Sequence, residues 1–302
     1  MYVRGGARLP KLLWQDRWWV LLLIGLAVAT ELLEPHVARI ELFSVVYVGV
    51  LSAALSIFLV FRFNEAYERW WEARKLWGGL VNLSRDFARQ SLTLLSEDQV
   101  RAEGKRLIYG QIAFVHALRL RLRDDGPAEA ADTLRRFLPE AAVPILESEN
   151  IPSAVLRAQS GRLAAMLRGS TDDRIVLTRF DTTISGLNDV QGGCERIKTT
   201  VFPSMVRAMS TVFVWGTATL IPIVFLEPDQ SVRPVEFCAV FFICRALIVV
   251  KQLGFSLMDT FENADNDIPM TALCRTIERD LRGQLGESNL PPSIQPSKGV
   301  LL

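Results

Sequence analysis

The chain has 302 residues, of which 50% are hydrophobic and 22% are charged. Lysine plus arginine number 34 and aspartate plus glutamate number 33, so the formal net charge is +1. This balance excludes a generally basic nucleic-acid binder. The chain has only two histidines, too few to favour a histidine-based metal site or histidine acid–base catalysis, and its four cysteines are too scattered to indicate a disulfide framework.

Four apolar runs predict membrane spans. Residues 18–30 form a short first run, and residues 42–61 form a second run without a formal charge. Residues 208–226 are also uncharged, and residues 237–258 are apolar apart from two basic residues and a few neutral polar ones. A span needs about 20 apolar residues, which the second and third runs supply.

Two alternatives compete with this interpretation. The first run could be a signal peptide, but no small-residue cleavage site follows it, and Glu31 and Glu34 stand there instead. The other runs could be core helices of a soluble protein, but two of them reach full spanning length without a charge. We therefore expect four retained spans.

Basic residues give the orientation, because they favour the cytosolic side. They gather before the first run and after the second: Arg4, Arg8, Lys11, Arg17, Arg62, Arg69, Arg74 and Lys75. The hairpins at 34–41 and 227–236 carry one arginine each. We expect an inner (plasma) membrane protein with both termini and the long middle segment in the cytosol.

The remaining sequence is predicted to be helical. Apolar residues at three- and four-residue spacing predict helices over 63–95 and 98–123. Short helices are expected around 128–137 and 153–168, and Thr171, Asp172 and Asp173 indicate the start of a helix that runs to about Lys198. The tail from Glu287 is rich in proline and serine and is expected to be poorly ordered.

The expected fold is an all-α membrane protein in four parts. Residues 1–61 hold the N-terminal segment and two spans, and residues 62–207 form a large helical cytosolic region. Residues 208–258 hold two further spans, and residues 259–302 form a cytosolic C-terminal segment and tail.

Enzyme signatures are absent from the sequence. It has no phosphate-binding glycine loop, no GxSxG elbow and no HExxH helix. Gly192-Gly193 is interpreted as a helix irregularity, and His116 as a structural or surface histidine. We predict no enzymatic activity and no metal or cofactor.

The junction after the second run, FRFNEAYERWWEARKLWG at 61–78, interleaves charges with aromatic residues. It could be an interfacial anchor or a subunit-packing surface with buried Arg–Glu and Arg–aromatic contacts. The string resembles the signature that follows the second membrane helix of bestrophins. The segment FENADNDIPM at 261–270 resembles the segment after the last span of that family, and CERI at 194–197 resembles its bacterial branch.

The resemblance implies a homopentameric ion channel with four membrane helices per subunit and one axial pore. Its partners would be further copies of the chain, the lipid bilayer and small monovalent ions, without nucleic acid. The family association favours chloride as the conducted ion, and conduction of sodium or of both ions is the open alternative. The motif residues expected in subunit packing are Arg62, Asn64, Tyr67, Arg69, Trp71, Glu72, Arg74, Trp77, Glu262, Asn263, Asp267 and Pro269.

By this resemblance the pore neck is formed by Ala53, Ile57 and Phe61. Residues four apart lie on nearly the same helix face, and five copies would give stacked apolar rings that gate by dewetting. The alternative is that Ile57 and Phe61 pack against other membrane helices. Ala53 departs from the bulkier residues common in the family, which predicts a wider outer end.

A second, cytosolic constriction in the family corresponds to the helix that starts near Asp172, with Ile175 and Thr178 as candidates. Ordinary core packing of Ile175 is the alternative.

Animal members hold calcium with a consecutive acidic run after the last span. Here Asn263 and Asn266 interrupt that run, so we expect no obligatory calcium dependence. Asp267 is instead predicted to cap the following helix. Arg245, inside the last span, is a functional candidate without an assigned role.

Two other function classes compete with the channel. A membrane-anchored scaffold or signalling protein would lack conductance in purified form. A transporter should show broken helices with internal pseudo-symmetry, which this sequence does not show.

Overall fold

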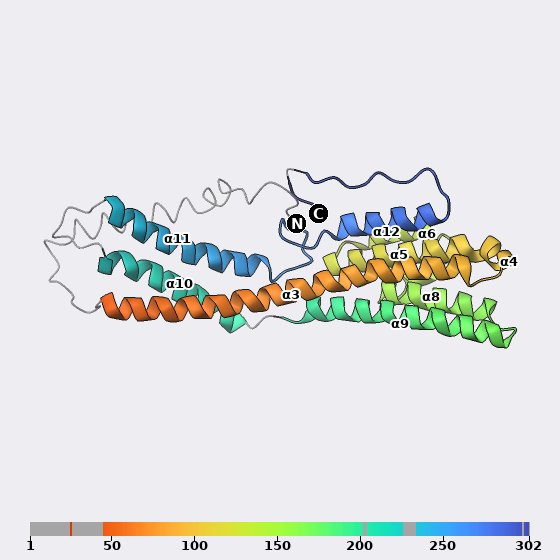
Figure 1. The fold of residues 1–302 in the computed structure, drawn as a ribbon, viewed down its shortest axis with the longest axis horizontal. Coiled ribbons are helices and arrows are strands. Elements are labelled where there is room, and N and C mark those ends of the chain that lie inside the picture. The colour runs from red at the N-terminus through yellow and green to blue at the C-terminus, as the bar shows by residue number, and fades with distance from the viewer. Residues whose placement is uncertain (1–24, 26–44, 202–203, 226–233, 298, 302) are drawn as a thin grey trace. The chain divides into compact units, whose positions relative to one another are not determined.

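The computed structural model describes residues 25, 45–201, 204–225, 234–297 and 299–301. Its helices are α3 (Val45–Thr93), α4 (Glu97–Gln99), the π-helix η2 (Val100–Gly104), α5 (Lys105–Arg123), α6 (Pro127–Phe137), α7 (Ala142–Leu146), α8 (Ile151–Met166), α9 (Thr171–Thr199), α10 (Ser204–Phe225), α11 (Pro234–Ser256) and α12 (Met270–Gln284). The described residues contain no strand, only an isolated bridge between Ser297 and Val300. The protein is therefore mostly helical, as predicted (Figure 1).

The chain divides into two compact units, which we describe separately. The span unit contains the described residues of Gly5–Arg69 and Val201–Met258. The helical unit contains those of Trp70–Thr200 and Asp259–Leu302. Helix α3 has its first part in the span unit and its second part in the helical unit.

In the span unit, α10 and α11 run beside the first part of α3 (Figure 1). Two small apolar clusters hold these helices together, and Leu55, Leu59, Val214 and Ile248 form one of them. The described residues include three helices long and apolar enough to cross a membrane. They cover most of the predicted second, third and fourth spans, while the predicted first span lies outside the described residues apart from residue 25.

The helical unit has one large apolar core. Helix α5 lies in it among α3, α8, α9 and α12. Phe87 of α3 meets Phe180 of α9 edge to face, with ring centroids 5.5 Å apart. Two buried polar pairs cross this core: Gln90 Nε2 donates to Thr183 Oγ1 at 2.8 Å, and Gln111 Nε2 donates to Ser84 Oγ at 2.9 Å.

Local sequence explains where these helices begin. Ser96 and Gln99 form a capping box before η2, and Ser170 with Asp173 forms another at the start of α9. Helix α6 starts at Pro127, where its missing amide hydrogen costs nothing. The predicted helices are thus present, and α7 is a short helix that the periodicity did not indicate.

The Gly192-Gly193 pair does not interrupt α9, so the predicted irregularity is wrong. A Cβ on Gly193 would lie 2.9 Å from Leu76 Cδ1, and one on Gly186 would lie 3.1 Å from Leu83 Cδ2. The two glycines lie seven residues apart and face leucines that are also seven apart. Both glycines therefore allow α9 to pack closely against α3.

The C-terminal tail also differs from expectation. The carboxylate of Glu287 accepts hydrogen bonds from Tyr109 Oη at 2.8 Å and Arg282 Nε at 2.7 Å. Arginines of α12 then donate to backbone carbonyls of the tail, from Arg275 to Pro292 at 3.2 Å and from Arg279 to Pro291. These bonds hold the tail along α12, although its composition is that of a disordered segment.

Candidate functional site

The three residues predicted for the neck lie in one column on the exposed side of α3. Ile57 is 60% exposed and Phe61 is 66% exposed, and Ala53 is also exposed. Large apolar side chains at this exposure are costly in water, at about 25 cal/mol for each Å². The column therefore requires a cover or environment that the described part of one chain does not provide.

The packed side of α3 lies roughly opposite this column. Its buried residues include Leu55, Leu59 and Arg62, and the two leucines pack against α10 and α11. Each helical residue turns the chain by about 100°, which places this stripe across the helix from Ile57 and Phe61. Among the helices that the structure describes, neither side chain is covered by a neighbour.

The exposed column continues beyond Phe61 with polar residues. Asn64 and Glu68 follow Phe61 by three and seven residues, so they lie on nearly the same helix face, and both are exposed. Asn64 belongs to the predicted motif residues, whereas Glu68 was not predicted as a site residue. Its spacing from Phe61 was the available signal.

The residues predicted for the cytosolic constriction lie near the start of α9. Ile175 is 59% exposed and Thr178 is also exposed, while the core face of α9 is formed by Phe180, Ile184 and Leu187. The Thr178 hydroxyl donates to Arg174 O at 2.8 Å. Ordinary core packing of Ile175, the alternative interpretation, is therefore wrong.

The first half of the family motif packs within the span unit. Arg62 is buried, its guanidinium carbon lies 3.9 Å from the centroid of the Phe255 ring, and its Nη2 lies 3.6 Å from Met258 Sδ. Tyr67 is half-exposed and stacks on Phe63, with the two ring centroids 6.5 Å apart. Asn64 and Arg69 belong to the same segment, and Arg69 is partly buried.

The second half of the motif packs within the helical unit. Trp77 is fully buried, whereas Trp71 is 47% exposed and stacks on Trp70. Glu72 accepts a hydrogen bond from Arg196 of α9. The Arg74 guanidinium lies beside Gly78, so this partly buried arginine runs along α3. The motif thus makes an arginine–aromatic contact at the buried Arg62 and an arginine–glutamate contact at the partly exposed Glu72, both within one chain.

The segment after α11 forms a tight turn. Glu262 pairs with Lys198 of α9 at 2.8 Å, and Asn263 adopts a left-handed backbone conformation with φ 68°. Buried Asp267 accepts from the Ala264 amide at 2.8 Å, and burial raises the pKa of this carboxyl against the opposing effect of its backbone hydrogen bonds.

Asp267 does not cap α12, so that prediction is wrong. The helix begins at Met270 with Pro269 at the N-cap position and no side-chain cap. Asp267 closes the preceding turn instead. Within the described ranges, no three His, Cys, Asp or Glu side chains gather closely enough to hold a metal ion.

A buried carboxylate links three helices of the helical unit. Glu278 of α12 is 1% exposed, with Arg136 and Arg282 at 3.3 Å, Arg275 at 3.4 Å and His116 Nε2 at 3.6 Å. Burial opposes ionisation, but His116 and the arginines hold the pKa of Glu278 below its usual value. Burial also lowers the pKa of His116, although Glu278 opposes this shift.

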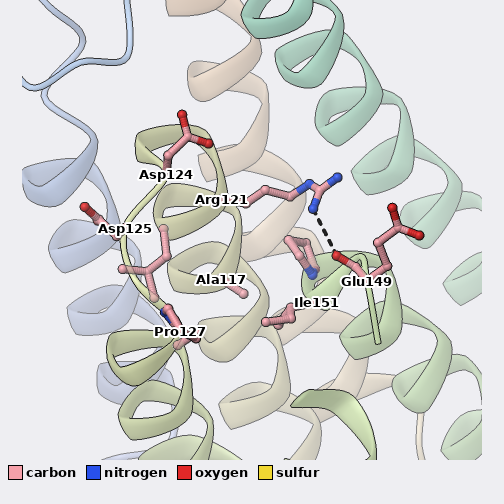
Figure 2. A pocket seen from close by; sticks show the side chains of 10 residues that line it. Ala117, Arg121, Asp124, Asp125, Pro127, Glu149 and Ile151 are labelled. Atoms are coloured by element: carbon pink, nitrogen blue, oxygen red, sulfur yellow. Dashed lines mark hydrogen bonds between the residues drawn. The ribbon is translucent and has the colours of Figure 1, made fainter. Parts of the chain in front are cut away.

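A pocket of about 370 Å³ opens between α5, α6 and the start of α8. Figure 2 shows Arg121 reaching across it towards Glu149, whose carbonyl oxygen accepts from Arg121 Nη1 at 3.2 Å. The ionisable residues that line the pocket are Arg121, Asp124, Asp125 and Glu149.

Comparison with known proteins supplies the context for these features. The family model of bacterial and fungal bestrophin proteins matches residues 6–283. A voltage-dependent anion channel-forming protein of Mesorhizobium japonicum is 30% identical over 98% of this chain and 92% of that protein. The voltage-dependent anion channel-forming protein YneE of Escherichia coli K12 is 32% identical, over 83% of this chain and 80% of its own.

Solved structures agree with the sequence comparisons. The crystal structure of a single-residue variant of a bacterial bestrophin homologue from Klebsiella pneumoniae superposes with a TM-score of 0.80 at 28% identity. The superposition covers 92% of this chain and 100% of the Klebsiella chain. Another membrane protein crystal structure gives a TM-score of 0.79 at 29% identity, with the same coverage.

Proposed function

The chain belongs to the bacterial and fungal bestrophin family, and from this premise we propose that it is a membrane channel for small anions. Relatives named as anion channel-forming proteins support anions as the conducted ions. The three described helices that are long and apolar enough to cross a membrane support a location in the membrane. The proposed assembly is a homopentamer in the inner membrane, with four spans per subunit and both termini in the cytosol. Calcium is not required in this proposal.

The observation that carries the proposal is the exposed apolar column of α3. In a five-fold assembly, Ala53, Ile57 and Phe61 would form three stacked rings, because residues four apart lie one turn apart. A narrow apolar bore holds water poorly and can therefore gate by dewetting. The phenyl edges of Phe61 carry partial positive charge, which favours a passing anion.

A second ring is proposed for the cytosolic part of the pathway. Ile175 and Thr178 occupy an exposed face near the start of α9, away from the core face of that helix. Five copies would place an apolar ring beside a ring of threonine side chains. Monovalent ions fit this route, because neither the neck nor this ring offers a fixed charge to hold a multivalent ion.

The test is conductance of the purified protein in planar bilayers, with reversal potentials measured under a NaCl gradient. Ile57→Ala/Phe61→Ala should enlarge the current, because a wider neck stays hydrated. The matched control is Tyr47→Ala/Leu51→Ala, which removes two exposed apolar side chains one turn apart, about 100° away around the same helix. Its current should match that of the wild type.

Two results would count against the proposal. A folded, pentameric wild type without current, silent also as the double variant, would favour a scaffold. If the current changed in the Tyr47→Ala/Leu51→Ala variant but not in the Ile57→Ala/Phe61→Ala variant, the pore would be lined by another face of α3. The sign of the reversal potential decides between anion and cation.

A further inference from the structure

Three cations of the span unit surround one aromatic ring. The guanidinium carbon of Arg62 lies 3.9 Å from the centroid of Phe255, and that of Arg207 lies 5.4 Å from it. Lys251 Nζ lies 5.6 Å from the same ring and 5.3 Å from the ring of Trp215. The cations come from α3, α10 and α11, so the fold brings them together from distant parts of the sequence.

These cations repel one another, because each carries a positive charge within a few ångströms of the same ring. Arg62 is in electrostatic range of both Arg207 and Lys251. Glu65, an exposed residue, offsets part of the charge of Arg62. Among the described residues, no carboxylate forms an ion pair with Arg207 or Lys251. Cation–π contacts contribute about 0.5–2 kcal/mol each, but they do not neutralise charge.

The cluster lies at one end of three candidate spans. The uncharged run of α3 ends just before Arg62, Arg207 lies in the first turn of α10, and Lys251 and Phe255 lie near the end of α11. Backbone amides in the first turn of a helix add partial positive charge. Charges at the ends of apolar helices meet the membrane at the level of the lipid headgroups.

We infer that Arg207, Lys251 and Arg62 form a binding site for the phosphate of an anionic lipid headgroup. Arg207 is exposed and Lys251 is partly buried, so these two can reach a headgroup directly. Arg62 is buried against Phe255 and contributes its charge to the same cluster. The site uses no residue of the proposed pore column.

The test is native mass spectrometry of the purified full chain in detergent, with phosphatidylglycerol or phosphatidylcholine titrated in. Both lipids carry a phosphate, but only phosphatidylglycerol has a net negative charge. The wild type should bind phosphatidylglycerol preferentially. Arg207→Gln/Lys251→Gln should weaken this binding about thirtyfold, from the membrane attraction lost with two basic residues.

Two matched variants separate charge from folding. Arg101→Gln/Arg135→Gln removes two exposed cations of the helical unit and should bind phosphatidylglycerol like the wild type. Arg207→Lys/Lys251→Arg keeps both charges and should retain most of the binding. This exchange keeps the inference testable if the glutamine pair does not fold.

The inference would be overturned by equal binding of both lipids to the wild type, by loss of the preference in the folded exchange variant, or by retention of the preference for phosphatidylglycerol in the glutamine pair. If inorganic phosphate displaces phosphatidylglycerol in competition and stays bound without lipid, the cluster is instead a site for a soluble anion. The readout is binding alone, so it is independent of whether the protein conducts.

Discussion

Glu278→Gln should destabilise the helical unit strongly. The carboxylate is 1% exposed, and four cationic or ionisable groups lie 3.3–3.6 Å from it. At these distances each arginine–carboxylate pair amounts to about 5 kcal/mol at an effective dielectric constant near 20. Desolvation of the carboxylate offsets much of this, and removal of one member of a buried pair typically costs about 3–5 kcal/mol.

The lower end of that range applies here. Side-chain exposure is 58% for Arg136 and 25% for Arg275, so water can solvate both after the substitution. A loss of about 3 kcal/mol corresponds to a fall in melting temperature of about 6–12 °C for a domain of this size. The full chain in detergent would be followed by intrinsic fluorescence, because Trp77 is buried in the same unit.

Asp132→Asn is the matched control. Asp132 pairs with Arg135 at 3.8 Å, and both side chains are mostly exposed, so the expected loss is below about 1 kcal/mol. If Glu278→Gln lowered the melting temperature no more than Asp132→Asn, the carboxylate would not hold the cationic side chains together, and the reasoning would fail.

Three further predictions concern acid stability, helix packing and selectivity. Burial holds the pKa of His116 below its ordinary 6.5, so below about pH 6.5 the unfolded chain binds a proton that the folded chain does not. Stability should therefore fall on acidification through this range, and melting curves of His116→Gln should show a smaller fall. Gly193→Leu should cost about 1–3 kcal/mol in thermal unfolding because Leu76 fills the space, whereas Gly192→Leu should not destabilise, since nothing lies within 4 Å of its Cβ position. Glu68→Gln should shift the reversal potential towards that of chloride if its carboxylates line the proposed pathway, and an unchanged potential would place Glu68 outside it.

Much of the fold follows from sequence periodicity. Apolar spacing predicted the long helix through Leu76 and Leu80, and Asp172 and Asp173 correctly indicated the start of α9. These signals are local, because one turn of helix contains them. The short helix α7 has no comparable pattern, and the cap of α9 is Ser170, one residue before the predicted start.

Contacts between distant segments could not be predicted in this way. Nothing near Arg62 in the sequence indicates Phe255 or Lys251, because these residues meet only when α3 packs against α11. Aspartate is a common N-cap residue, yet the Asp267 carboxylate accepts a hydrogen bond from the Ala264 amide in the preceding turn instead. The exposure of Ile57 agrees with a neck position, but that position itself was inferred from family resemblance and stays a proposal.

The bonds between α12 and the tail have a consequence for sequence drift. Arg275, Arg279 and Arg282 donate to the backbone carbonyls of Pro292, Pro291 and Asn289. Every residue type has such a carbonyl, so the side chains of the tail can change while its attachment persists. The three arginines have no such freedom, because no other residue reaches a carbonyl with the same planar, permanently charged donor. Among related sequences, residues 289–292 of the tail should therefore vary more than the three arginines of α12 that bind them.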